Sequence, residues 1–317
     1  MHLRKIQLVA GSTYTISLPK EWVKRNHLKE QQNLQLYEGN DHTLIISPET
    51  SKEKKTDELS INVDDYQHNI DQILLAVYYL GTETIRLHSK KELRKDTKAR
   101  IRKALSCMSG TEISYEDKNT ITIKVLLDKS KVNLTQLIYR ISLIIESCIA
   151  NITDELNIEE IRINENEIDR LYQLIVKIIS LALIDANVLH SSEIRNISLV
   201  PSYFLISKRL ENISDSLYNL AEYYYVEKIH PEGIKDLLLP LKEELSRTIT
   251  HLLKPSKIFE KSKESTVISI RNNINKTKNT NVRNYIEEIV RFWIDIEEEV
   301  VIISFYTKLF LAEKSNG

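Results

Sequence analysis

The sequence predicts a multidomain protein with short strands first, a small α+β region next and long helices over the remainder. Three observations predict this order. Short strand patterns surround one helix in the first 50 residues, strands alternate with helices over residues 58–128, and helical periodicity begins at Asn133. A chain of 317 residues also exceeds one typical core. We therefore expect domains at 1–50, 58–128 and 133–317.

The first domain is expected to be built from short strands around one helix. The fixed φ of Pro19 suits a helix start, which predicts a helix at Lys20–His27. Strands are predicted at Arg4–Ala10 and Thr13–Leu18 around a Gly11-Ser12 turn, and at Leu34–Tyr37 and Leu44–Ser47 across Glu38–Asp41. The lysine-rich run Ser47–Asp57 contains Pro48 and is predicted to be a linker.

In the middle region, strand patterns alternate with helix patterns, which predicts a βαβαββ order. Such an order is typical of a small α+β sandwich. Strands are expected at 59–63, 84–88, 111–115 and 120–126, and helices at 69–80 and 94–108.

The last region is predicted to be an all-α bundle of six helices. Breaks are expected at Pro201, Pro231 and Pro255 and at polar runs, and the short connections favour a bundle. The expected helices are 134–156, 164–190, 199–227, 231–253, 257–279 and 282–313.

Composition excludes several classes of protein. Net charge is −1, so any surface for nucleic acid must be local. Cys107 and Cys148 are the only cysteines, which excludes a disulfide scaffold and a cysteine-based zinc site. Apolar runs fall short of the roughly 20 residues that cross a bilayer, so we expect no membrane insertion and a cytoplasmic location. HExxH, Walker, GxGxxG and GxSxG motifs are absent, which argues against an enzyme.

Two predicted helices each carry an acidic pair four residues apart. The pairs are Glu165 with Asp169 and Glu211 with Asp215. Residues i and i+4 share a helix face, so each pair points two carboxylates the same way. Their like charges repel each other unless a cation or solvent offsets the repulsion. A metal ion, a basic partner or plain solvent can offset this repulsion. A single acidic pair of this kind most often lies on a solvated helix face. Each pair here lies beside an apolar stripe, which favours a position at the edge of an interhelix groove.

The second pair belongs to a longer string, Leu210-Glu211-Asn212-Ile213-Ser214-Asp215, which continues to Asn219-Leu220-Ala221-Glu222. Together with Glu167-Ile168-Asp169-Arg170-Leu171-Tyr172, this stretch resembles the PhoU family of phosphate-signalling proteins. The resemblance implies a bundle whose acidic motifs bind iron or another divalent metal, and a role in regulating phosphate uptake. The ligands it implies are Glu165, Asp169, Glu211 and Asp215, with Glu222 as a further candidate.

The second half of the bundle departs from this family pattern. Glu287 is followed four residues later by Arg291, and Glu288 by Phe292. A cation or an aromatic ring cannot replace a hard oxygen ligand. We therefore expect metal ligands in the first half only, and Arg209, beside Glu211, is a cation that can neutralise that half without metal.

Positive charge is concentrated at the beginning of the chain. Over residues 1–29, six cationic side chains stand against one carboxylate, Glu21. The segments Arg4-Lys5, Gly11-Ser12-Thr13, Ile16–Trp22 and Lys24-Arg25 resemble the AbrB/SpoVT group, whose chains interlock in pairs as a swapped-hairpin β-barrel that binds DNA. The resemblance implies a homodimer on duplex DNA, with phosphate contacts from Arg4, Lys5, Lys20, Lys24 and Arg25.

These resemblances cover nearly the whole chain and match an arrangement of archaeal proteins. They predict a DNA-binding regulator whose PhoU-like bundle senses phosphate status through a metal or a partner protein. One alternative is a protein that does not bind DNA, whose first domain only dimerises while its bundle docks on a phosphate transporter subunit or a kinase. A metal-storing protein or metal-dependent enzyme is a third interpretation.

Overall fold

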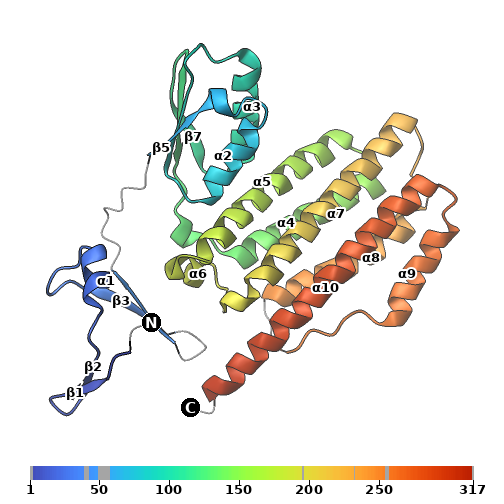
Figure 1. Cartoon of the computed structure of the whole chain (residues 1–317). Helices are drawn as coiled ribbons and strands as arrows, with labels where there is room; N and C mark the ends of the chain where they lie inside the picture. Colours follow the sequence, from blue (N-terminus) through green and yellow to red (C-terminus); the bar gives the residue numbers. More distant parts are fainter. Residues whose placement is uncertain are drawn as a thin grey trace. The chain divides into compact units, whose positions relative to one another are not determined.

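The computed structural model describes residues 3–38, 43–48, 58–194, 196–231, 233–253 and 257–315, without the side chains of 37–38 and 310–315. The chain divides into two compact units, Met1–Lys55 and Thr56–Gly317, and each is described by itself (Figure 1). The turn predicted at 38–41, most of the linker predicted at 47–57 and the break predicted at Pro255 lie outside the described residues. Within the described ranges, no helix has the length and apolarity needed to cross a membrane.

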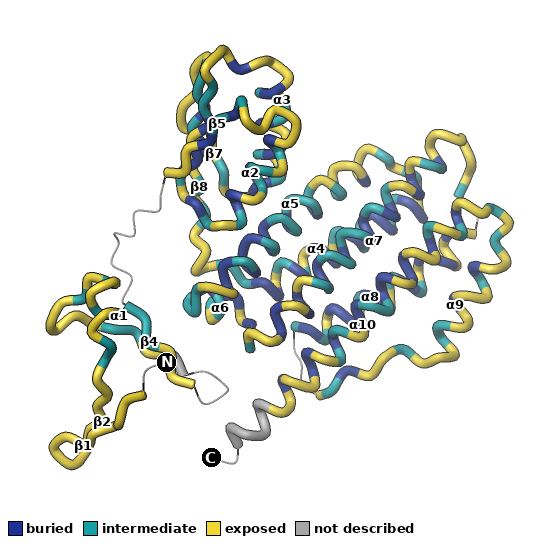
Figure 2. The backbone as a smooth tube through the Cα atoms, viewed as in Figure 1, coloured by how far each residue is buried: buried dark blue, intermediate teal, exposed yellow. Residues whose placement is uncertain are grey.

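The first unit, here called the headpiece, consists of two short hairpins and one helix. Its elements are β1 Gln7–Val9, β2 Thr13–Thr15, α1 Lys20–Arg25, β3 Leu34–Glu38 and β4 Leu44–Pro48. β1 pairs antiparallel with β2, β3 pairs antiparallel with β4, and the two pairs form separate sheets. The first two strands are shorter than predicted, because pairing within one copy extends over only three residues of each. None of its described residues is buried (Figure 2). Interlocking of two copies into a barrel stays a prediction.

The middle region has the predicted βαβαββ order. Its elements are β5 Glu58–Asn62, α2 Ile70–Tyr79, β6 Thr84–His88, α3 Lys95–Ser106, β7 Thr111–Glu116 and β8 Thr120–Val125. The strands form one sheet in the order β5-β6-β8-β7, with β5 and β6 parallel and the other pairs antiparallel. Figure 1 shows α2 and α3 on one side of this sheet. Alternate residues such as Ile85, Leu87, Ile121 and Ile123 point inward and are fully buried, as period-two patterning requires.

The last region is a helical bundle with one large apolar core. Its helices are α4 Leu134–Thr153, α5 Ile158–Ala182, α6 Ala186–Ser191, α7 Val200–Glu227, α8 Ile234–Leu253, α9 Glu264–Lys276 and α10 Thr280–Ser315. Each long helix buries one apolar stripe in this core, as Ile168, Leu171 and Ile175 do on α5. α5 and α7 run side by side, and α7 also packs along α10 (Figure 1). The predicted multidomain architecture, with strands first, an α+β sheet next and a helical bundle last, is confirmed.

Two predicted helices are wrong in extent. The helix expected at 164–190 begins earlier, where the Asn157 side chain accepts a hydrogen bond from the Glu160 N–H, and ends at Ala182. Asp185 has an extended backbone there and caps a separate short helix, α6. The helix expected at 257–279 begins only at Glu264. In the preceding segment, the backbone N–H of Phe259 donates to Ser304 Oγ of α10 at 2.8 Å. This hydrogen bond takes the place of one within a helix.

The α+β region is joined to α5 by buried contacts at the end of α2. Lys177 of α5 is 3% exposed, and its Nζ donates to the carbonyl oxygen of Tyr78 at 2.9 Å. The Tyr79 hydroxyl donates to Gln173. Gly81 follows with φ of +82°, and a Cβ there would lie 2.6 Å from Leu181 Cδ2. These contacts bring the α+β region against the helix that carries the first acidic pair.

Candidate metal site and nucleic-acid interface

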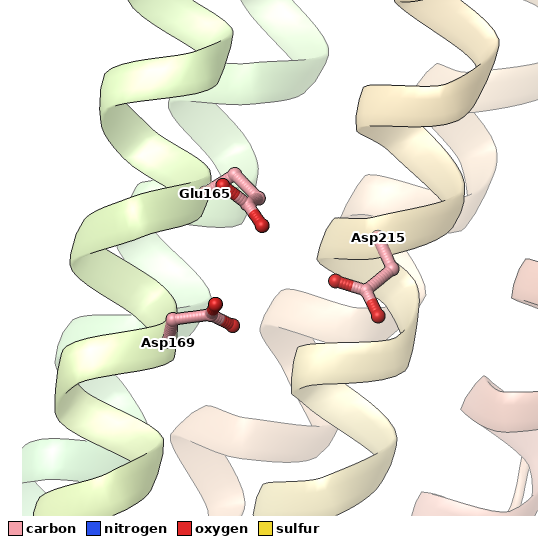
Figure 3. A group of neighbouring side chains, drawn as sticks. All are labelled: Glu165, Asp169 and Asp215. Atoms are coloured by element: carbon pink, nitrogen blue, oxygen red, sulfur yellow. The ribbon is translucent and has the colours of Figure 1, made fainter. Parts of the chain in front are cut away.

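Three of the four predicted metal ligands meet between α5 and α7. Glu165 and Asp169 project from α5 towards Asp215 of α7 (Figure 3). One oxygen of each carboxylate lies within 4.8 Å of the other two. We call these three residues the acidic cluster. The geometry follows from the sequence, because the i, i+4 spacing aligns the two α5 carboxylates beside the stripe of α5 that is buried.

The pKa values of the carboxyl groups in the acidic cluster are raised above their usual range. Burial raises the pKa of Asp169 to about 6, and the charges of Glu165 and Glu211 act in the same direction. Burial likewise raises the pKa of Asp215 to about 6, with Glu211 and Asp169 contributing. The pKa of Glu165 is raised by burial and by Asp215 and Glu211. Three half-buried carboxylates that repel one another favour a cation, which would relieve that repulsion.

Glu211, the fourth predicted ligand, is bound to a lysine. Lys208 Nζ lies 2.5 Å from Glu211 Oε2, and Asn212 Nδ2 donates to the same oxygen at 3.1 Å. The prediction that Arg209 neutralises this half is wrong, since Arg209 Nε instead pairs with Asp295 of α10 at 2.8 Å. The charge of Lys208 opposes the rise in the pKa of both Asp169 and Asp215, so Lys208 is the cation that acts on both aspartates of the acidic cluster.

The remaining acidic candidates lie outside the acidic cluster. Glu222 accepts a hydrogen bond from the Tyr218 hydroxyl at 3.2 Å. In the second half, Ser216 Oγ donates to Glu288 at 3.4 Å, while Glu287 and Arg291 line a separate cavity of about 760 Å³. Among the residues that the structure describes, the acidic cluster is the one group of three potential ligands close enough to share a metal.

The donor set of the acidic cluster fits a hard divalent cation. Three carboxylates from two helices supply only oxygen ligands, which Mg²⁺, Mn²⁺ and Ca²⁺ prefer and which iron also accepts. These side chains are partly exposed, so water can complete the coordination shell.

Lys103 of α3 and Cys107, the residue after α3, interact electrostatically with the acidic cluster, which the sequence did not predict. The charge of Lys103 opposes the rise in the pKa of Glu165. Burial raises the pKa of the Cys107 thiol, and the charges of Asp169 and Glu165 raise it further. No local signal in the sequence predicts this interaction, because it depends on α2, the neighbour of α3, packing on α5 through the buried contacts of Lys177 and Gly81.

The five predicted DNA contacts all lie exposed on the headpiece. Arg4 and Lys5 precede β1, while Lys20, Lys24 and Arg25 lie on α1. None of the five forms an ion pair with another described residue. Their charges are therefore free to act on a polyanionic partner.

The chain thus combines an exposed basic headpiece with a helical bundle that carries the acidic cluster. Residues 7–54 match the family model described as antidote-toxin recognition MazE, bacterial antitoxin, and residues 140–224 match the PhoU domain. The chain thus carries a MazE/AbrB-like N-terminal domain and a PhoU domain, which confirms both resemblances. The PhoU match includes all of the predicted metal ligands and ends before α8. No curated protein and no solved structure matches the chain.

Proposed function

We propose that the protein is a homodimeric, cytoplasmic DNA-binding regulator of phosphate uptake, with a regulatory and not a catalytic role. Its PhoU domain responds to phosphate status through a bound metal or a partner protein. One observation carries this proposal: a headpiece with five exposed, unpaired cations stands on the same chain as a PhoU domain. MazE/AbrB-like domains point to DNA binding or toxin recognition, and the excess of cations favours DNA.

The exposed apolar surface of the headpiece supports dimerisation. Leu3 is 81% exposed, Tyr14 is 70% exposed and Ile6 is 69% exposed. Isolated two-stranded hairpins are marginal in water. A second copy that interlocks with these strands would bury the apolar side chains and double the number of cations on one face.

The acidic cluster supports a metal in the PhoU domain. Glu165, Asp169 and Asp215 would hold a divalent cation, and its positive charge would relieve their mutual repulsion. Because Lys103 of α3 interacts electrostatically with Glu165, a metal bound there would act on the α+β region as well as on the bundle.

DNA binding by the full-length protein tests the proposal. Fluorescence anisotropy with a labelled duplex of mixed sequence should show binding that weakens steeply with salt. Replacing Lys24 and Arg25 by Ala removes four cations from a dimer, so the slope of log K against log salt should fall by about 4. The control K90A/K91A removes the same charge from an exposed part of the α+β region and should leave the slope unchanged.

The same assay separates the second candidate function. If the headpiece only dimerises, while the PhoU domain docks on a transporter subunit or a kinase, the wild-type protein will not bind the duplex at moderate salt. The match to an antitoxin model is the observation that favours this candidate, because such domains also recognise protein.

A further inference from the structure

We propose that a pocket at one end of the bundle binds a small phosphate-bearing anion. The pocket lies where the α7–α8 connection meets the end of α9 and the start of α10, and its volume is about 880 Å³. The inference rests on the proposed function for its role, because it supplies a direct sensor of phosphate status. The site is separate from the acidic cluster: Asp215 and Tyr224 lie nine residues apart on α7, which is about 14 Å along the helix axis.

Cations outnumber carboxylates around this pocket. The described lining residues include Lys235, Lys276 and Lys278 together with His230, against one carboxylate, Asp236. Glu232 lies outside the described residues.

Not all of these cations are occupied by protein partners. Lys235 Nζ is shared with Asp154 at 3.0 Å, and Lys276 Nζ has only the neutral amide oxygen of Asn273 at 3.3 Å. Lys278 and His230 make no ion pair with any described residue. Two ammonium groups and an imidazole are thus available to an anion, and a phosphate group accepts such charge-assisted hydrogen bonds well.

The floor of the pocket is apolar and fixed. Tyr224, Ile234, Leu237 and Val282 line it, and each is at most 5% exposed because it also belongs to the bundle core. The first N–H of α8, at Ile234, donates to the Pro231 carbonyl oxygen at 3.4 Å, but the next N–H groups lack partners within the helix and add donors at the pocket wall. The site therefore combines a rigid apolar base with cations and N–H donors at its rim.

This combination selects the class of ligand. Pockets for small molecules span about 300–1,000 Å³, and a single orthophosphate would leave most of this volume unfilled. An apolar base with a cationic rim fits an organic phosphate such as a nucleoside phosphate. Inorganic phosphate and tripolyphosphate carry the same anionic group but have no apolar part to contact the base of the pocket.

Isothermal titration of the full-length protein tests the inference. ATP, tripolyphosphate and orthophosphate are titrated separately in buffer with EDTA, which excludes phosphate bound through a metal at the acidic cluster. We expect ATP to bind most tightly. The variant K276Q/K278Q should bind it at least about tenfold more weakly, since one charge-assisted hydrogen bond corresponds to about a factor of ten. The control K90Q/K91Q removes the same charge elsewhere and should bind ATP like the wild type.

The outcomes are decisive in both directions. Absence of binding by all three probes at millimolar concentration, or equal affinity in K276Q/K278Q and the control, would overturn the inference. Tighter binding of tripolyphosphate than of ATP, lost in K276Q/K278Q, would support the anion site and assign it to inorganic phosphate chains. DNA binding measured on the same preparations separates the two proposals: loss of anion binding with intact DNA binding refutes only the pocket, and the reverse refutes only the DNA-binding role.

Discussion

Replacing Lys208 by Met should strengthen metal binding at the acidic cluster. The Lys208 ammonium acts on both aspartates of this cluster and lies 2.5 Å from Glu211 Oε2. Without it, a divalent ion no longer meets a fixed positive charge, and Glu211 becomes free to act as a fourth carboxylate ligand. Met keeps most of the side-chain volume but loses the cation–π contact of Lys208 Nζ, which lies 5.1 Å from the centre of the Tyr172 ring.

The magnitude follows from the charges and their exposure. Two unit charges about 5 Å apart interact by about 3 kcal/mol at an effective dielectric constant of about 20. The Lys208 side chain is 37% exposed, and solvent screening reduces the repulsion to about 1 kcal/mol for a partly exposed pair. The dissociation constant should therefore fall by about five- to tenfold. Without metal, the variant should be less stable than the wild type by about 1–2 kcal/mol, because Glu211 is only 12% exposed and loses its partner.

Calorimetric titration with Mn²⁺ at pH 8 measures the affinity while Asp169 and Asp215 are ionised. Lys242 provides the matched control, because its side chain is 35% exposed and belongs to α8, away from the acidic cluster. The variant K242M should bind Mn²⁺ like the wild type. An unchanged or weaker affinity in K208M, with K242M unchanged, would refute the assignment of Lys208 as the competing cation.

Further predictions concern the acidic cluster and the α2–α5 contact. D169N/D215N should lose Mn²⁺ binding and should make the metal-free protein more stable above pH 6. The pKa of each aspartate is raised in the folded protein to about 6 from its usual 3.8, so ionisation destabilises the fold above pH 6 and this cost is relieved as the pH falls. After a discount for solvent access, this cost is about 1–2 kcal/mol per carboxylate. Urea unfolding at pH 5 and pH 8 measures it. If the free energy of unfolding depends on pH in the same way in the variant and the wild type, the prediction is wrong. G81A should destabilise the second unit by about 1–3 kcal/mol, because φ is +82° and its Cβ would meet Leu181; an unchanged thermal midpoint would disprove this packing.

The sequence predicted most of what depends on local pattern. Alternation over Thr84–His88 and Thr120–Val125 gave the correct strands, because each has one face on a buried core. The α5 pair was predictable for the same reason, since Glu165 and Asp169 share a helix face. Features that depend on distant partners were not predictable. The stretch 257–263 has a pattern compatible with helix, yet its backbone N–H groups at Phe259 and Ser262 donate to side chains of α10. The approach of Cys107 to the acidic cluster likewise depends on how two cores pack.

The assignment of Arg209 as the neutralising cation failed for a reason that the sequence itself contains. Residues of an α-helix are separated by about 100° around the axis. Arg209 is two residues from Glu211 and therefore lies about 200° away, on the side of α7 that faces Asp295 of α10. Lys208 is three residues from Glu211 and returns to within about 60° of it, which is the spacing that lets side chains meet. Neighbours along the chain are thus poor candidates for counter-ions on a helix. The same rule applies to Glu287 in the second half of the bundle. Arg291 lies four residues from Glu287, on the same helix face, where a second carboxylate would be needed to hold a metal.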